Sequence, residues 1–260
     1  MIHYFLGEED GAQRPPGRAS DIGGSAPEER PAALPIVSVP VGESDVVRAA
    51  YAWNLAVEIA RQGASATILA PVQSEATPLW PEAGRGPVGV EVALSPAQNF
   101  GDLNRAALDI AVRRAAESGD GGVVLATVPP QWFREAETGR ALLRWVLLFT
   151  AAEAADLLEA YGMAKLVIAA NPDSRIGVTI HGVRRVAEAE AAFRRVAEVT
   201  ARRLDHRLES YGLLVDDLHV YRAIVSRRPI GLEHPQSRAA RALRDVASLL
   251  LEDSKVRAVV

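Results

Sequence analysis

Cysteine is absent from all 260 residues of the sequence. Its absence excludes disulfide bonds, thiolate catalysis and thiolate metal sites. Long apolar runs are missing too, so we expect no transmembrane segment. Residues 1–7 have neither the basic start nor the long apolar core of a signal peptide. These absences together lead us to expect a soluble, cytoplasmic protein.

Lysine is scarce, because Lys165 and Lys255 are the only two among 29 basic residues and the rest are arginine. The formal net charge is −4 and the isoelectric point is near 5.8. An overall negative charge does not draw a chain to nucleic acid or to anionic lipid, so nucleic acid is not expected as a partner. Lys165 falls in a predicted helix, where we expect a surface or ion-pair role.

Proline and glycine are concentrated near the amino terminus. Residues 11–35 contain five prolines and almost no large apolar side chains, which is typical of a linker. We therefore divide the chain into an amino-terminal arm with its linker, residues 1–35, and one α/β domain, residues 36–260. The short apolar segment at residues 2–6 is interpreted either as a docking peptide or as an added edge strand or frayed terminus.

From residue 36 onward, short apolar runs alternate with long helical patterns. This alternation is typical of βαβ units and predicts an α/β fold, with a doubly wound, mostly parallel sheet and helices on both faces. The predicted strands are residues 36–41, 66–70, 88–94, 122–127, 145–150 and 176–181. The predicted helices are residues 46–62, 102–118, 151–169, 183–211 and 237–252.

The predicted helix 183–211 is the longest. Its apolar side chains recur at helical spacing, which predicts one buried face: Val186, Phe193, Val196, Thr200, Leu204 and Leu208. The opposite face is rich in arginine: Arg184, Arg185, Arg194, Arg195, Arg202 and Arg203. We expect this second face to be solvated, and association with DNA through it is the alternative.

The segment between the first predicted strand and the first predicted helix has the position of a phosphate-binding loop. Such a loop follows Gly-x-x-x-x-Gly-Lys-[Ser/Thr], in which backbone N–H groups and the lysine hold the phosphates and the hydroxyl binds magnesium. Residues 42–49 read GESDVVRA. The candidate nucleotide-contacting residues are therefore Gly42, Glu43, Asp45, Arg48 and Ala49, of which only the glycine fits the pattern.

The substitutions in this loop all act against a polyphosphate. Val47 brings a branched side chain to the position of the second glycine. Arg48 keeps a positive charge as a planar fork, Ala49 offers magnesium no oxygen, and Glu43 and Asp45 repel phosphate. If each lost contact is worth roughly 1.5–3 kcal/mol, two or three losses weaken binding by about three powers of ten. We predict no ATP hydrolysis and neither ATP nor magnesium as a cofactor.

Further motifs follow the loop in a fixed order. Asn54-Leu55-Ala56 lies in the next helix, Gly63 precedes the second strand, and residues 153–165 read EAADLLEAYGMAK. These segments resemble the MinD/ParA family of deviant P-loop ATPases. The last of them is similar to EPTALTDAYALIK of the flagellar-number regulators FlhG and FleN, with five identities. The resemblance covers residues 36–252 at low identity and implies a P-loop NTPase fold.

The resemblance also implies where nucleotide contacts would lie. Counting back from Asn54 places Glu43 at the family's signature lysine, which reaches across a dimer to the partner's nucleotide, and Arg48 at its second lysine. Glu43 cannot take that role. His181 falls in the region where the family has an asparagine that contacts adenine.

The carboxylates that the family uses around magnesium are missing. Residues 70–73 read APVQ where the second strand should end in an aspartate pair, and residues 126–130 read ATVPP in place of an Asp-Thr and a switch glycine. Thr127 is the only survivor. Trp132 and Phe133 follow this segment at the switch-like position; exposed, they would bind a protein partner, and the alternative is burial under the neighbouring loop.

The histidines offer no metal site by their spacing, and Asp216-Asp217 are explained by a turn. The leading hypothesis is a catalytically degenerate MinD/FlhG-like protein, a non-hydrolysing binding or regulatory module in flagellar or cell-pole positioning. A protein partner is expected, and a homodimer or a heterodimer with an active paralogue is possible. The alternatives are a switch that keeps weak ATP binding through Arg48, and a ParA-like DNA-associated module.

Overall fold

The computed structural model describes residues 33–72, 83–117, 121–137 and 140–257. Nearly all of the predicted arm, including the apolar segment 2–6, lies outside this part. The described strands form one sheet in the order β3-β4-β2-β5-β1-β6-β7-β8, in which only β3 is antiparallel to its neighbour. They are β1 Ile36–Pro40, β2 Ser65–Pro71, β3 Gly84–Arg85, β4 Glu91–Ser95, β5 Gly122–Val128, β6 Trp145–Thr150, β7 Arg175–Val183 and β8 Glu209–Val215.

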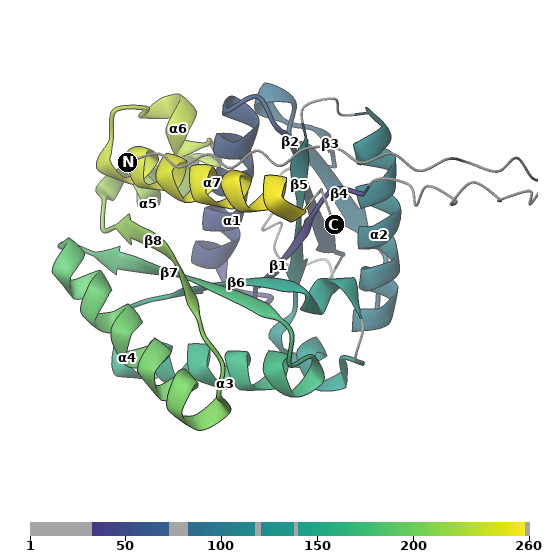
Figure 1. The fold of residues 1–260 in the computed structure, drawn as a ribbon. Helices are drawn as coiled ribbons and strands as arrows, with labels where there is room; N and C mark the ends of the chain where they lie inside the picture. Colours follow the sequence, from purple (N-terminus) through teal and green to yellow (C-terminus); the bar gives the residue numbers. More distant parts are fainter. Residues whose placement is uncertain (1–32, 73–82, 118–120, 138–139, 258–260) are drawn as a thin grey trace, which may run out of the picture. The chain divides into compact units, whose positions relative to one another are not determined.

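Helices cover both faces of the sheet (Figure 1). They are α1 Val46–Arg61, α2 Phe100–Glu117, α3 Ala154–Ala170, α4 Val186–Leu204, α5 Leu218–Ser226, α6 Ile230–Glu233 and α7 Arg238–Arg257. The first helix and the last three contribute to one core, and α2, α3 and α4 contribute to the other. This arrangement confirms the predicted doubly wound α/β fold. Within the described residues, no helix combines the length and the apolar character that crossing a membrane requires.

The central strands show why the sheet is covered on both sides. Val123 and Leu125 of β5 enter the core beside α1, and Val124 and Ala126 enter the core beside α2. All seven residues of β5 are buried. Successive side chains of a strand point to opposite faces, so a strand buried on both faces reads as a continuous apolar run and not as an alternating one.

The predicted strand 88–94 begins too early. Val88 lies in a short 3₁₀ turn, with a φ of 51°, and β4 starts only at Glu91. A left-handed conformation at a branched residue cannot belong to a regular strand. The apolar run misled the prediction because the turn itself contains valines.

The predicted helix 183–211 is also wrong in its limits. Val183 is the last residue of β7, and α4 ends at Leu204 because Asp205 adopts a left-handed conformation, with a φ of 49°. Tyr211, predicted as helical, is a buried residue of β8. Val186, placed on the buried face by the prediction, lies in the first turn of α4 and is 58% exposed.

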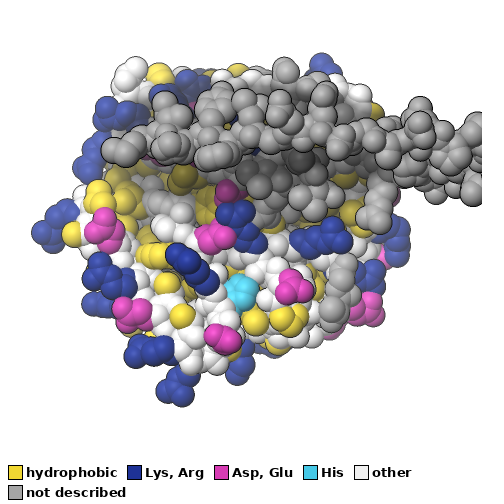
Figure 2. Space-filling view, viewed as in Figure 1, with side chains coloured by type: hydrophobic (Ala, Val, Ile, Leu, Met, Phe, Trp, Pro, Cys, Tyr) yellow, Lys and Arg dark blue, Asp and Glu magenta, His cyan; other side chains and the backbone are white. Residues whose placement is uncertain are grey.

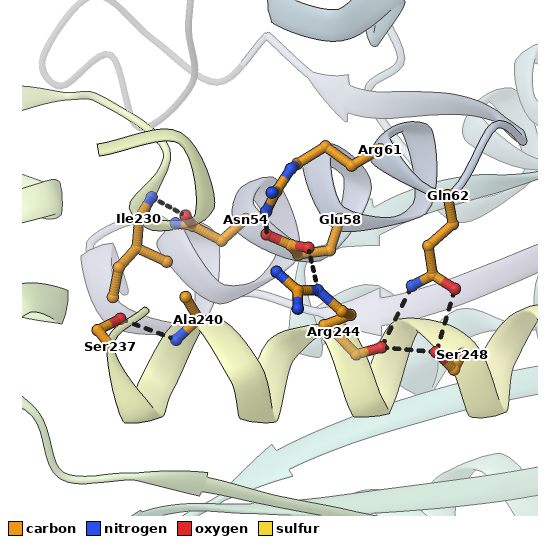
Figure 3. Close-up of polar contacts among 9 residues, drawn as sticks. All are labelled: Asn54, Glu58, Arg61, Gln62, Ile230, Ser237, Ala240, Arg244 and Ser248. Carbon is orange, nitrogen blue, oxygen red and sulfur yellow. Dashed lines mark hydrogen bonds and ion pairs between the residues drawn. The ribbon is translucent and has the colours of Figure 1, made fainter. Parts of the chain in front are cut away.

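Polar contacts join α1 to the carboxy-terminal helices (Figure 3). The Asn54 side chain donates to the Ala50 carbonyl and accepts the backbone N–H of Ile230, with a nitrogen–oxygen distance of 2.7 Å. One turn on, Glu58 is 1% exposed and forms an ion pair with Arg61. The Asn54 contact therefore has a structural use, since it fixes the start of α6 against α1.

Candidate functional site

The candidate loop connects β1 to α1 at the carboxyl edge of the sheet. β1 lies between β5 and β6, and the chain continues from it toward β2 on one side and later returns to β6 on the other. Ligands of doubly wound sheets bind at such a switch point, beside the carboxyl ends of the strands. The position is one where ligands of such sheets bind, and its chemistry depends on which groups the loop presents.

The backbone donors of the loop are largely used within it. The N–H of Asp45 donates to the Gly42 carbonyl at 3.1 Å, and the N–H of Val46 donates to the Ser44 carbonyl at 3.0 Å. In a phosphate loop these groups would point at the ligand. Turning them inward removes two of the donors that a phosphate needs.

Asp45 also caps the helix that follows. Its side chain accepts the backbone N–H of Arg48 at 2.9 Å, and its carbonyl accepts the N–H of Ala49 at 3.0 Å. A carboxylate at a helix amino terminus satisfies free N–H groups and complements the helix dipole. The protein's own anion therefore stands at the helix terminus where a bound phosphate would stand.

Arg48 is engaged by two carboxylates. Its guanidinium donates to both oxygens of Glu159 on α3, at 2.7 and 3.1 Å, and lies 3.3 Å from the Asp45 carboxylate. The Arg48 side chain is 14% exposed and that of Glu159 is 53% exposed. A bidentate pair of this kind is geometrically specific. The one cation that the loop retains is thus held by the protein and is not presented to a ligand.

The charges of this pair stabilise each other. Burial acts against the charge of Arg48, but the hydrogen bond to Glu159 and the negative charge of Asp45 leave its pKa raised. The hydrogen bond from Arg48 lowers the pKa of Glu159, against the opposing effect of partial burial. Both groups are therefore ionised at neutral pH, and the pair persists there.

The residues present do not fit magnesium and a polyphosphate. Glu43 is exposed at the edge of the loop, and Ala49 is buried with no oxygen to offer. Beside Arg48, between β1 and α3, the structure leaves a hollow of about 20 Å³, which is room for a water molecule. A side chain added at Gly42 would meet only Asp45, at an ordinary contact distance of 3.8 Å. The surviving glycine is not required by this loop geometry.

The other positions at which the family pattern would place magnesium-binding groups are apolar or form hydrogen bonds within the sheet. Ala70 is fully buried at the end of β2, and Val72 follows it; Gln73 lies outside the described residues. Thr127 is buried in β5, and its hydroxyl donates to the Leu69 carbonyl at 3.2 Å. The hydroxyl that survives from the family pattern therefore bonds to a neighbouring strand. In the part of the chain that the structure describes, no cluster of metal-ligating side chains occurs.

His181 lies near the end of β7, close to the loop. Its ring centroid is 5.2 Å from that of Tyr51, which in turn lies 5.8 Å from that of Phe149. Burial lowers the pKa of His181, and the charge of Arg48 lowers it further. The structure brings His181 and Arg48 into one neighbourhood, with an aromatic cluster beside them that the sequence did not indicate. A contact between His181 and a nucleotide stays a prediction.

The predicted partner-binding aromatics lie in a 3₁₀ segment, Pro130–Glu135. Phe133 is 2% exposed and packs edge-on against Phe100, with ring centroids 5.5 Å apart. Trp132 is partly buried against the same core. Lys165, for which the sequence predicted a surface or ion-pair role, lies on α3 and is exposed. A partner-binding role for Trp132 and Phe133 stays a prediction, in which Trp132 supplies the accessible surface.

Glu159 was missed as a site residue. It lies within the segment 153–165 that carries the resemblance to the flagellar branch, but 111 residues separate it from Arg48. No local pattern indicates a contact over that distance. The expectation of a parallel sheet gave one usable signal, because the carboxyl ends of parallel strands lie at the same edge, where the helices after β1 and after β6 both begin.

The fold is similar to solved structures of MinD and ParA ATPases. A chain of the MinC:MinD cell division protein complex from Aquifex aeolicus matches with a TM-score of 0.56 and 15% identity, over 84% of this chain and 95% of that one. The ParA family ATPase from Chlorobium tepidum TLS matches with 0.55 and 12%, over 84% and 98%. Cyanothece McdA, in an ATP complex, matches with 0.53 and 12%, over 85% and 96%.

No family model and no curated protein matches the sequence. At identities this low, the similarity to solved structures establishes the fold of the MinD/ParA ATPases. The loop described above therefore lies on that fold, and its residues decide what it does there.

Proposed function

We propose that this chain is a non-hydrolysing protein with the MinD/ParA fold that acts as a binding or regulatory module. The observation that carries the proposal is the pairing of Arg48 with Glu159 and Asp45, since it occupies the loop's cation with the protein's own carboxylates. The inward-turned donors of Asp45 and Val46 support it. The scaffold is kept, and the groups that would hold a nucleotide serve to hold the loop and α3 together.

Within this proposal, the flagellar-number branch is the finer assignment. It rests on residues 153–165, whose sequence resembles the corresponding segment of FlhG and FleN. The process would then be flagellar or cell-pole positioning. A protein partner fits such a role, and one similar structure is that of a complex between MinC and MinD. A homodimer, or a heterodimer with an active paralogue, is the assembly that the family resemblance favours.

Calorimetric titration of the purified chain with ATP and with ADP, with and without magnesium, tests the proposal. We expect no saturable heat up to millimolar nucleotide. Saturable, magnesium-dependent binding would contradict the proposal and favour a nucleotide switch. The Arg48→Glu variant then locates the site, with Arg105→Glu on α2 as the matched control, because the Arg105 side chain is 74% exposed and far from the loop in sequence.

The two outcomes of that comparison are distinct. Binding that Arg48→Glu abolishes and Arg105→Glu keeps would assign the nucleotide to the loop. Binding that neither change affects would place it elsewhere. For the ParA-like alternative, the exposed arginines of α4 are the candidate surface, and only a salt-dependent interaction with duplex DNA would support it.

A further inference from the structure

Helix α5 presents an apolar face to solvent. Val220 and Ala223 are buried against the core on one side. On the other side, Leu218, Tyr221 and Val225 have exposed fractions of 60%, 54% and 86%. Their spacing of three and four residues places them in one row along the helix; we call these three residues the α5 stripe. Single exposed apolar side chains are ordinary, but a row that covers a whole helix face indicates an interaction site.

The helix that carries the stripe is held in place at both ends. The Asp217 side chain accepts the backbone N–H of His219 at 3.0 Å and that of Ala239, at the start of α7, at 3.3 Å. At the other end, the N–H groups of Arg227 and Arg228 donate to carbonyls of the last turn. A capped and docked helix presents its exposed side chains without the cost of ordering them on binding.

Arginine surrounds the stripe. Arg222 lies four residues after Leu218 and so on the same face, and Arg227 and Arg228 follow the helix. Among the described residues, Arg228 pairs with Glu233 at 3.1 Å, whereas neither Arg222 nor Arg227 has a carboxylate within ion-pairing distance. In Figure 2, hydrophobic and positively charged side chains lie next to each other at the left edge, on the side where Figure 1 shows α5 and α6.

We propose that the α5 stripe is the docking surface for an acidic amphipathic helix of a partner protein. Apolar side chains of that helix would cover Leu218, Tyr221 and Val225, and its carboxylates would pair with Arg222 and Arg227. Two helices pack through apolar side chains at this spacing, and tyrosine and arginine are the residue types that dominate the energy of protein interfaces. The unpaired arginines make an acidic surface the complementary one.

This inference deepens the proposed binding role by naming the surface and the chemistry of the partner. It rests on that role, but on different residues from those of the loop. Nucleotide titration tests the loop, and the experiment below tests the stripe. A failure of one is therefore distinguishable from a failure of the other.

The experiment places a photo-reactive benzoylphenylalanine at Val225 of the full chain in cells of its source. Mass spectrometry then identifies the segment that becomes cross-linked. A synthetic peptide of that segment is titrated against the purified full chain by fluorescence anisotropy. We expect an acidic segment with apolar residues at helical spacing, which binds more weakly as salt rises.

The variants change exposed side chains, so that a loss of peptide binding can be distinguished from a loss of folding. We expect Val225→Asp and Arg222→Glu each to weaken binding of the peptide at least tenfold. The matched controls are Leu158→Asp, an exposed leucine on α3, and Arg105→Glu, and we expect them to leave the affinity unchanged. Circular dichroism of the four variants checks that each is folded.

Several results would overturn the proposal. These are a cross-link to a second copy of this chain, a cross-linked segment without acidic residues, the absence of any cross-linked protein, and a peptide affinity that Arg222→Glu leaves unchanged. Sedimentation with phosphatidylglycerol vesicles that Val225→Asp abolishes would assign the stripe to a membrane surface instead.

Discussion

The guanidinium of Arg48 and the carboxylate of Glu159 form a two-point contact between the helix after β1 and the helix after β6, across 111 residues of sequence. Arg48 occupies the place of a phosphate-binding lysine in the loop pattern, and Glu159 lies in the segment that resembles the flagellar branch. Under the proposed function, this contact within the protein stands where a nucleotide-binding loop would contact its ligand. It ties the loop to α3, so the loop contributes to the free energy of unfolding, and that contribution can be measured.

A double-mutant cycle with Arg48→Met and Glu159→Gln measures that role. We expect a coupling free energy of about 0.5–1 kcal/mol, because half of the Glu159 side chain is exposed and solvent screens the pair. Urea denaturation of the two single variants and the double variant gives the value. Additive effects on the free energy of unfolding would show that the two side chains do not interact in solution.

The same pair predicts a dependence on pH. Arg48 lowers the pKa of Glu159 in the folded state below its ordinary value of 4.5. A carboxylate of this kind stabilises the fold fully above its ordinary pKa, and the stabilisation is lost as the pH falls through the lowered, folded-state pKa. The stability difference between wild type and Glu159→Gln should therefore stay constant from neutral pH to about pH 5 and shrink below that. Denaturation midpoints across this range check it, and a difference that grows on acidification would contradict it.

Two glycines should respond in opposite directions to alanine. A side chain at Gly177 would lie 2.3 Å from two ring carbons of Tyr211, a residue 1% exposed, whereas one at Gly162 on α3 meets nothing within 4 Å. We expect Gly177→Ala to destabilise the fold by about 3 kcal/mol. Gly162→Ala should stabilise it by about 0.5–1 kcal/mol, since alanine favours a helix. Free energies of unfolding from urea titration decide both, and a neutral Gly177→Ala would refute the close packing.

The alternation of apolar runs and helical patterns predicted the sheet and its main helices, because strands buried on both faces and long amphipathic helices have strong patterns. The patterns failed where tertiary structure sets the boundary. Leu204 and Leu208 keep helical spacing across the end of α4, which is marked by a left-handed Asp205 and not by glycine or proline. The nine residues of α5 were not assigned at all, since a helix of this length completes too few turns for its period to stand out in the sequence.

For the loop, the sequence was informative about what is missing and uninformative about what replaces it. The absence of the lysine, the second glycine and the hydroxyl can be read at Arg48, Val47 and Ala49 directly. That Asp45 would cap α1 follows from its position before the helix, by the rule for helix starts. The engagement of Arg48 by Glu159 depends on how two distant helices pack, and no spacing rule reports it.

Asn54 supplies the last prediction. In the family pattern this asparagine marks the helix after the loop, and here its side chain accepts the backbone N–H of Ile230, a buried contact at 2.7 Å. Asn54→Ala leaves that N–H without an acceptor at the start of α6, so we expect the free energy of unfolding to fall by about 1–3 kcal/mol. Urea denaturation measures the loss.

Gln62→Ala is the matched control for Asn54→Ala. Gln62 lies just beyond the end of the same helix, and its amide contacts the Arg244 carbonyl at 3.2 Å and the Ser248 hydroxyl at 3.0 Å (Figure 3). Both contacts are exposed, so water replaces them and we expect a change within about 0.5 kcal/mol. If the two variants lost the same stability, burial of the Asn54 contact would not be what makes it matter, and the motif asparagine would need another explanation than the anchoring of α6.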